Sequence, residues 1–284
     1  MTMKSVLLPF EESPALPSML ESALLVARRF GSYIEGLHVR LAQSSLVLSG
    51  EGFVSPELLE SFRRQDVERT QHVRNLFDTF MGNKGIVYGE APRADGEPCA
   101  GWREAVAPSE EMVGSRGRVF DVIVVGRPVR GSPTPGMGTL EAALFDSGRP
   151  VLIAPPVPPS TLGQSIAIAW NGSSETARTI ALALPFLVAA ERVTVISAEE
   201  SMVPGPSGTE IVRYLEWNGV RSEAIDIGAG NRPVGEAILA AAGKWGADML
   251  IKGGYTHSRI RQMIFGGATQ QILAAAELPV FMAH

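Results

Sequence analysis

The sequence predicts an α/β fold made of two tandem doubly wound domains, each a five-stranded parallel sheet with helices on both faces. Two observations lead to this prediction. Short apolar runs alternate along the chain with longer stretches whose apolar residues keep helical spacing. The second half of the chain also repeats the pattern of the first half. Apolar strands that alternate with amphipathic helices are typical of a parallel sheet covered on both faces.

Three pairs of segments carry the repeat: Ser5–Ser13 with Ser165–Ser173, Asp121–Gly126 with Asp248–Gly253, and Arg149–Ala154 with Leu278–Ala283. The first pair joins an apolar strand to a polar turn that ends in Ser and opens a helix. The offset between partners is 160 residues in the first pair, 127 in the second and 129 in the third. The first half therefore carries 33 additional residues in its middle, and its glycine loop is two residues shorter.

The second half shows the alternation most clearly. Its predicted strands are Ser165–Trp170, Arg192–Ala198, Arg221–Ile227, Ala247–Ile251 and Pro279–Ala283. Helical spacing follows the first strand at Ala177, Ile180, Ala181, Leu184 and Val188, and the third strand at Val234, Ala237, Ile238, Ala241 and Trp245.

The first half adds a long predicted helix, from about Pro56 to Phe80, whose apolar face contains Val73 and Phe77. The proline-rich run Pro155–Pro159 is a stiff connector and the natural boundary between domains. We therefore expect a first domain over residues 1–158, with the helical insertion, and a second domain over residues 163–284.

Composition excludes several classes of protein. The chain has 284 residues, of which 45% are hydrophobic and 19% charged, and its net charge of −5 is unlike that of a general nucleic-acid binder. Cys99 is the only cysteine and the four histidines lack ligand spacing, so we expect no metal site. The apolar run before Pro9 is too short for a signal peptide, and no stretch approaches the ~20 apolar residues of a membrane helix. We therefore expect a cytoplasmic protein that binds neither membranes nor nucleic acid.

The glycine-rich segment Gly253–Ala268 is the most informative part of the chain. It follows the apolar run Asp248–Ile251 and precedes an Ala-rich predicted helix, Ala268–Ala276. Backbone N–H groups are free where a loop enters a helix, and the helix dipole there favours negative charge. The segment therefore indicates either a phosphate-binding loop or an ordinary connection of a doubly wound domain.

Together these residues resemble the universal stress protein family in its tandem two-domain form, over nearly the whole chain. Nucleotide-binding members have Asp-Gly-Ser after strand one. After strand four they have Gly, two residues, Gly, nine residues and Gly-Ser or Gly-Thr. Here Asn171-Gly172-Ser173 stands for the first element, and Gly253, Thr256 and Gly266-Gly267 keep the spacing of the second. The resemblance implies nucleotide-binding residues Asn171, Gly172, Ser173, Gly253, Gly254, Thr256, Gly266, Gly267 and Ala268.

Three positions depart from the family pattern. Asn171 replaces the Asp that meets the adenine edge, so it keeps a hydrogen-bonding side chain but loses the carboxylate. Thr256 stands where the family has a glycine, and its β-branched side chain crowds a phosphate and resists positive φ. Gly267 lacks the hydroxyl of Ser or Thr. Each lost hydrogen bond to a charged group is worth about 1.5–3 kcal/mol.

Basic residues of the second half are further candidates. Arg232, His257, Arg259 and Arg261 either supply charge to a phosphate or belong to a solvated surface. Lys252 ends a buried strand, and its amino group reaches either the site or the solvent.

The first half departs further from the pattern. Glu11-Glu12-Ser13 replaces Asp-Gly-Ser, and Pro9 lies inside the strand. Its glycine loop, from Gly126 to Thr139, is rich in proline and mis-spaced, although Gly138-Thr139 matches the final Gly-Thr. We expect this half to be a degenerate copy with a structural or regulatory role.

The resemblance implies a stress-response protein whose second domain binds an adenine nucleotide, ATP with Mg²⁺, as a sensing or regulatory ligand. The alternative is a nucleotide-free universal stress protein that acts as an interaction scaffold. An enzyme is a third interpretation, but the sequence has no GxxxxGK[ST], no carboxylate pair near the loop and no nucleophile–base motif. We therefore assign no catalytic residue and expect at most slow ATP hydrolysis.

The resemblance also implies that the last strands of the two domains, Val151–Ala154 and Val280–Ala283, pair with each other. The two halves would then form a pseudo-dimer within one chain. Protein partners and the association of two chains as a homodimer stay open.

Overall fold

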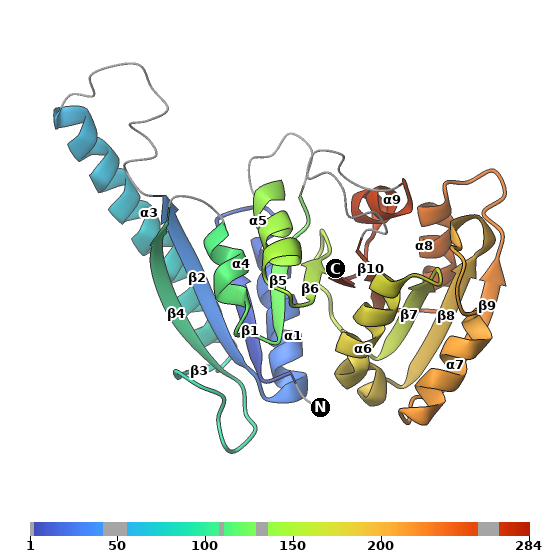
Figure 1. Ribbon diagram of the computed structural model, residues 1–284. Helices are drawn as coiled ribbons and strands as arrows, with labels where there is room; N and C mark the ends of the chain where they lie inside the picture. Colours follow the sequence, from blue (N-terminus) through green and yellow to red (C-terminus); the bar gives the residue numbers. More distant parts are fainter. Residues whose placement is uncertain (1–2, 42–55, 108–110, 129–135, 255–266) are drawn as a thin grey trace.

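The computed structural model describes residues 3–41, 56–107, 111–128, 136–254 and 267–284. These residues form one eleven-stranded sheet covered by helices (Figure 1). Elements of the first half are β1 (Ser5–Pro9), α1 (Leu16–Phe30), β2 (Tyr33–Leu41), α3 (Pro56–Asn83), β3 (Val87–Tyr88), β4 (Cys99–Ala107), α4 (Glu111–Gly117), β5 (Val122–Gly126), α5 (Met137–Glu141), the π-helix η1 (Ala142–Asp146) and β6 (Val151–Ala154). Elements of the second half are β7 (Ser165–Trp170), α6 (Ser174–Ala189), β8 (Arg192–Ala198), η2 (Glu199–Ser201), α7 (Gly208–Trp217), β9 (Ser222–Ile227), α8 (Val234–Lys244), β10 (Met249–Gly253), α9 (Gly267–Ala275) and β11 (Val280–Ala283).

The two halves share one topology. The sheet order is β3-β4-β2-β1-β5-β6-β11-β10-β7-β8-β9, and every pair inside a half is parallel. In each half the first strand lies in the middle, with the last two strands on one side and the remaining strands on the other. The predicted α/β fold is confirmed. The first half also has the two-residue strand β3, which the prediction did not include.

Strand residues alternate between the two faces of the sheet, so each face has its own core. Val6 and Leu8 belong to one hydrophobic cluster, and Leu7 between them belongs to the other. The first cluster contains residues of α1, α3, α6 and α7, and the second contains residues of α4, α5, η1, α8 and α9. Helices therefore cover both faces, as the apolar runs predicted.

An antiparallel pair of strands joins the halves. Val280 of β11 pairs with Ile153 of β6, and Met282 pairs with Val151. The expected pairing of the two last strands is thus present. Because β6 and β11 run in opposite directions, the carboxyl ends of the strands lie at opposite edges of the sheet in the two halves.

Side chains of α1 and α6 strengthen this junction. Phe30 of α1 packs edge-on against Phe186 of α6, with ring centroids 4.9 Å apart. Arg29 donates from Nη1 to the carbonyl of Leu162, at 3.2 Å, in the segment that connects the halves. The division into domains at residues 158 and 163 stays a prediction.

The predicted bounds need small corrections. β10 begins at Met249 rather than Ala247, because the carboxylate of Asp248 accepts hydrogen bonds from the backbone N–H groups of Gln164 and Ser165. β10 continues to Gly253, which pairs with Ala283. The long helix α3 ends at Asn83, three residues beyond the expected Phe80.

We expect Phe281→Ala to destabilise the protein by about 3–5 kcal/mol, because it leaves a cavity in the first hydrophobic cluster, which includes residues of both halves. Phe281 is fully buried in β11, and its ring centroid lies 5.8 Å from that of Phe186. Urea unfolding followed by circular dichroism measures the change. The matched control is Trp217→Ala, at a side chain that is 76% exposed, where the change should stay within about 0.5 kcal/mol. Equal effects of both substitutions would contradict the central position of Phe281.

Candidate functional site

The strand order of the second half creates a switch point between β7 and β10. The chain leaves β7 for β8 on one side, and β10 and β11 lie on the other side. Ligands of open α/β sheets bind outside the carboxyl ends of the strands at such a point. The predicted residues Asn171–Ser173 follow β7, and Gly253 and Gly254 stand at the end of β10.

Asn171 organises the start of α6. Its Oδ1 accepts hydrogen bonds from Ser173 N (3.2 Å), Ser173 Oγ (2.8 Å) and Thr176 Oγ1 (2.7 Å). Ser173 is the N-cap, and its hydroxyl accepts from Thr176 N at 3.2 Å. The oxygen of Asn171 is therefore engaged inside the protein, and its amide NH₂ group is what it can offer a ligand.

The turn at Gly172 is covered by the chain itself. Gly172 has φ of +81°, and a Cβ there would meet the carbonyl oxygen of Val203 at 2.9 Å. Val203 also donates its backbone N–H to the carbonyl of Asn171, at 2.9 Å. Trp170 Nε1 donates to the carbonyl of Pro206 at 2.9 Å and holds the same segment. The sequence did not predict that the segment Met202–Pro206 lies beside this turn, because a local pattern does not indicate a backbone contact between residues about 30 positions apart.

Gly253 brings the two predicted elements together. A Cβ at Gly253 would lie 2.6 Å from Thr176 Oγ1 and 2.7 Å from the carbonyl carbon of Glu175. Only glycine therefore lets the first turn of α6 approach the end of β10. Gly254 donates its N–H to the carbonyl of Ala283 at 2.8 Å, so this group is already satisfied.

The other predicted residues divide into two groups. Gly267 and Ala268 are the first two residues of α9, and Gly267 is exposed. Thr256 and Gly266 lie outside the described residues, as do His257, Arg259 and Arg261. Arg232 is exposed just before α8.

Lys252 connects β10 to α9. Its Nζ donates to Thr269 Oγ1 at 2.8 Å and to the carbonyl of Gly253 at 2.9 Å. Thr269 lies in the first turn of α9 and is only 5% exposed. Burial of the amino group lowers the pKa of Lys252 from 10.5 to about 8. The structure thus places the amino group at the start of α9, and it adds Thr269, which sequence reasoning did not identify.

The corresponding edge of the first half has a small pocket. It includes about 260 Å³ of space, open mouth included, below the usual range for drug-sized ligands. Glu11, Ser13, Gly126 and Thr139 are among its lining residues. Thr139 Oγ1 donates to Glu11 Oε1 at 3.3 Å, so the pocket contains a carboxylate, whose negative charge would repel a phosphate. These features agree with a degenerate first copy, which stays a prediction.

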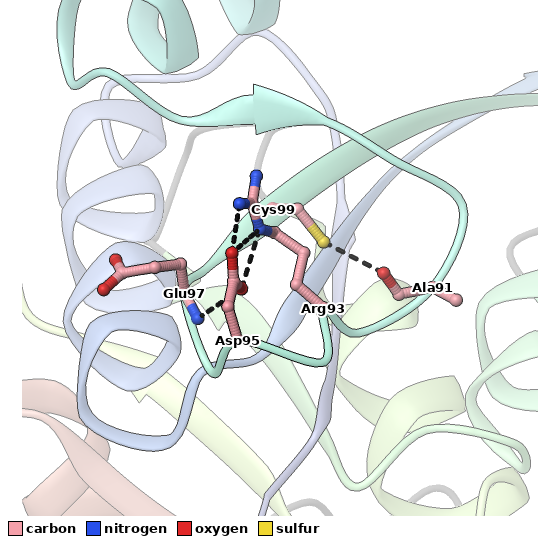
Figure 2. Close-up of polar contacts among 5 residues, drawn as sticks. All are labelled: Ala91, Arg93, Asp95, Glu97 and Cys99. Carbon is pink, nitrogen blue, oxygen red and sulfur yellow. Dashed lines mark hydrogen bonds and ion pairs between the residues drawn. The ribbon is translucent and has the colours of Figure 1, made fainter.

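Cys99 lies in a separate polar cluster at the β3–β4 connection (Figure 2). Its Sγ donates to the carbonyl of Ala91 at 3.1 Å, and burial raises the pKa of the thiol. Asp95 pairs with Arg93 and accepts from the N–H of Glu97. Cys99 thus has the properties of a structural thiol. Across the described segments, no group of three His, Cys, Asp or Glu residues could hold a metal ion, and no helix could span a membrane.

We expect Lys252→Met to change how stability depends on pH. The pKa of Lys252 is lower in the folded than in the unfolded chain, so between pH 8 and 10.5 the unfolded chain binds more protons. The free energy of unfolding of the wild type should therefore rise over this window relative to Lys252→Met, by on the order of 1–3 kcal/mol. Urea unfolding of both proteins across this window measures the difference between their free energies of unfolding. Contributions of the other titrating groups are the same in both proteins and cancel. A difference that stays constant with pH would contradict burial of the charge.

We expect Cys99 to resist thiol reagents in the folded protein. Its buried thiol with a raised pKa forms little thiolate at about pH 8, and thiolate is the reactive species. Absorbance after addition of 5,5′-dithiobis(2-nitrobenzoate) measures the reaction, and the urea-unfolded chain, with one thiol, is the control. Rapid stoichiometric labelling of the folded protein would show that Cys99 is accessible.

Comparisons with known proteins agree with this architecture. Residues 223–284 match the model of the universal stress protein family. A universal stress protein from Archaeoglobus fulgidus DSM 4304 superposes with a TM-score of 0.69 and 17% identity, over 99% of this chain and 96% of that chain. A functionally unknown protein from Pseudomonas aeruginosa PAO1 superposes with a TM-score of 0.56 and 16% identity, over 99% and 92% of the two chains. A search of curated protein sequences found no match. Residues 223–284 are therefore similar to the universal stress protein family, and the whole chain has the same fold as the universal stress protein from Archaeoglobus fulgidus.

Proposed function

We propose that the second half binds an adenine nucleotide, ATP with Mg²⁺, as the sensing or regulatory ligand of a cytoplasmic stress-response protein. One observation carries the proposal. Gly253, the first glycine of the second element, lies against the first turn of α6, and the Asn171–Ser173 turn begins that helix. This is the edge at which the sheet topology places ligands.

The phosphate end of the ligand would lie at the start of α9. The first backbone N–H groups of a helix have no partner inside it, and the positive end of the dipole favours an anion. Gly267 and Ala268 occupy these positions, and a Cβ at Gly267 would meet only Gln271 Nε2, at 3.8 Å, among the described residues. Apart from its chain neighbours and the backbone of α9, no other described residue lies within 4 Å of that Cβ position.

The base end would use Asn171 differently from the family's Asp. The oxygen of Asn171 serves the start of α6, so its NH₂ group would donate to a ring nitrogen of adenine. An Asp would instead accept from the adenine amino group. Recognition of the base is therefore altered at this position, while the donor needed for one hydrogen bond is kept.

The alternative function is a nucleotide-free scaffold. The contact of Val203 with the Asn171–Gly172 turn favours it, because this contact occupies space beside the turn that a ligand would otherwise use. We assign no catalytic residue in either case.

Calorimetric titration with ATP and Mg²⁺, after removal of co-purified nucleotide, distinguishes these functions. We expect about one site per chain, because the first-half pocket is small and contains the Glu11 carboxylate. GTP in place of ATP tests the base. The absence of both heat and thermal stabilisation at millimolar ATP would favour the scaffold, and steady release of phosphate would favour an enzyme.

We expect Gly267→Ser to tighten ATP binding by about tenfold, because it restores a hydroxyl donor for phosphate at an exposed position. Titration calorimetry of the variant measures the gain. Gly243→Ser is the matched control, because Gly243 is exposed in α8 and a Cβ there would have no neighbouring atom within 4 Å among the described residues. Equal effects of the two substitutions would contradict phosphate binding at the start of α9.

A further inference from the structure

Lys252 carries a positive charge whose two hydrogen-bond partners in the described part of the chain are both neutral. They are the hydroxyl of Thr269 and the carbonyl of Gly253, at 2.8 and 2.9 Å. Within the described ranges, no carboxylate forms an ion pair with Lys252. Burying an ammonium group is unfavourable unless an opposite charge compensates it.

The position of the amino group makes this more unfavourable. Lys252 has the same strand parity as Leu250, so it lies on the face that α8 and α9 cover. Its Nζ bonds to the third residue of α9, within the first turn, where the helix dipole is positive. Basic side chains are favourable at the opposite end of a helix. Two sources of positive potential therefore meet at one place.

A purely structural role explains these contacts less well. A neutral donor would satisfy Thr269 equally, without the desolvation of a charge. A lysine that only extended its amino group into solvent would keep its ordinary pKa, whereas the pKa of Lys252 is lowered by burial. An anion at this place would compensate both the ammonium group and the start of the helix.

We propose that Lys252 is a phosphate-binding residue, which acts together with the backbone of the first turn of α9. In its choice of ligand this inference rests on the proposed function, because the anion would be the phosphate chain of the nucleotide. The ammonium group would take the place of the hydroxyl that Gly267 lacks relative to the family pattern.

The test compares Lys252→Met with Lys244→Met, a matched control at an exposed lysine near the end of α8. Calorimetry with ATP–Mg²⁺ and with pyrophosphate measures affinity. We expect Lys252→Met to weaken binding of both ligands about 10- to 100-fold, as expected for one hydrogen bond to a charged group, and Lys244→Met to leave it unchanged.

Thermal unfolding supplies a readout that a structural role would not produce. Lys252→Met should raise the melting temperature of the ligand-free protein, because the buried charge is gone, and should reduce the stabilisation by ATP. If Lys252 had a purely structural role, its substitution would instead lower the melting temperature of the ligand-free protein. Lys252→Gln, which keeps a polar donor of similar length, replaces the Met variant if that variant does not fold.

The outcomes separate this inference from the proposed function. If ATP binds the wild type and the folded Lys252 variants equally well, the inference is wrong and the nucleotide function stands. If pyrophosphate binds only when Lys252 is present and ATP does not bind, the inference stands and the nucleotide function fails. Binding of neither ligand to the wild type overturns both.

Discussion

The candidate site depends on one close approach of backbone to backbone. The first turn of α6 lies so near the end of β10 that only glycine fits at position 253. This approach sets α6 against the sheet, and with it the Asn171–Ser173 turn that begins the helix. It also ends β10 one residue after Lys252, which leaves that side chain under the start of α9. A side chain at position 253 would separate the two elements by its own volume, because the contacted atoms belong to backbone and to a fixed helix start.

The junction of the two halves extends this arrangement. Arg127, directly after β5, donates to the carbonyl of Ala276 just beyond α9, at 2.5 Å. Leu144 of η1 would lie 3.5 Å from a Cβ at Gly254, where β10 ends. The first half therefore contacts both the end of β10 and the residue that follows α9. The two halves are thus in contact across the β6–β11 pair, and the carboxyl edge of the first half contains the Glu11 carboxylate.

The sequence was sufficient for much of this fold because the informative residues are periodic. Strands β7 and β8 have the predicted bounds, since each is an apolar run with a polar turn at its end. The pairing of the last strands followed from the family resemblance. Strand β3 was not predicted, because two exposed residues are too few to show an alternation of apolar and polar side chains. The site was harder to predict: spacing identified Asn171 and Gly253, but not which groups of the protein already occupy them. The oxygen of Asn171 and the N–H of Gly254 are used internally, and such long-range competition leaves no mark in a local pattern.

For Lys252, too, the local sequence pattern does not show which groups the side chain contacts. Its position also indicates what kind of ligand would suit the candidate site. Alternation placed it on a face of the sheet, but only the contact with Thr269 shows where its charge lies. Relative to the family pattern, Asn171 lacks a carboxylate, and Lys252 of this chain places an ammonium group at the start of α9. Both features make the potential of the candidate site more positive. A ligand here would therefore be selected more by its phosphate charge than by its base, because the charge-assisted contacts are the stronger ones and the base keeps one neutral donor. The departure at Gly267 removes a phosphate donor that Lys252 would replace, and the departure at Asn171 concerns only the base. Weaker recognition of the base therefore does not require the loss of phosphate binding.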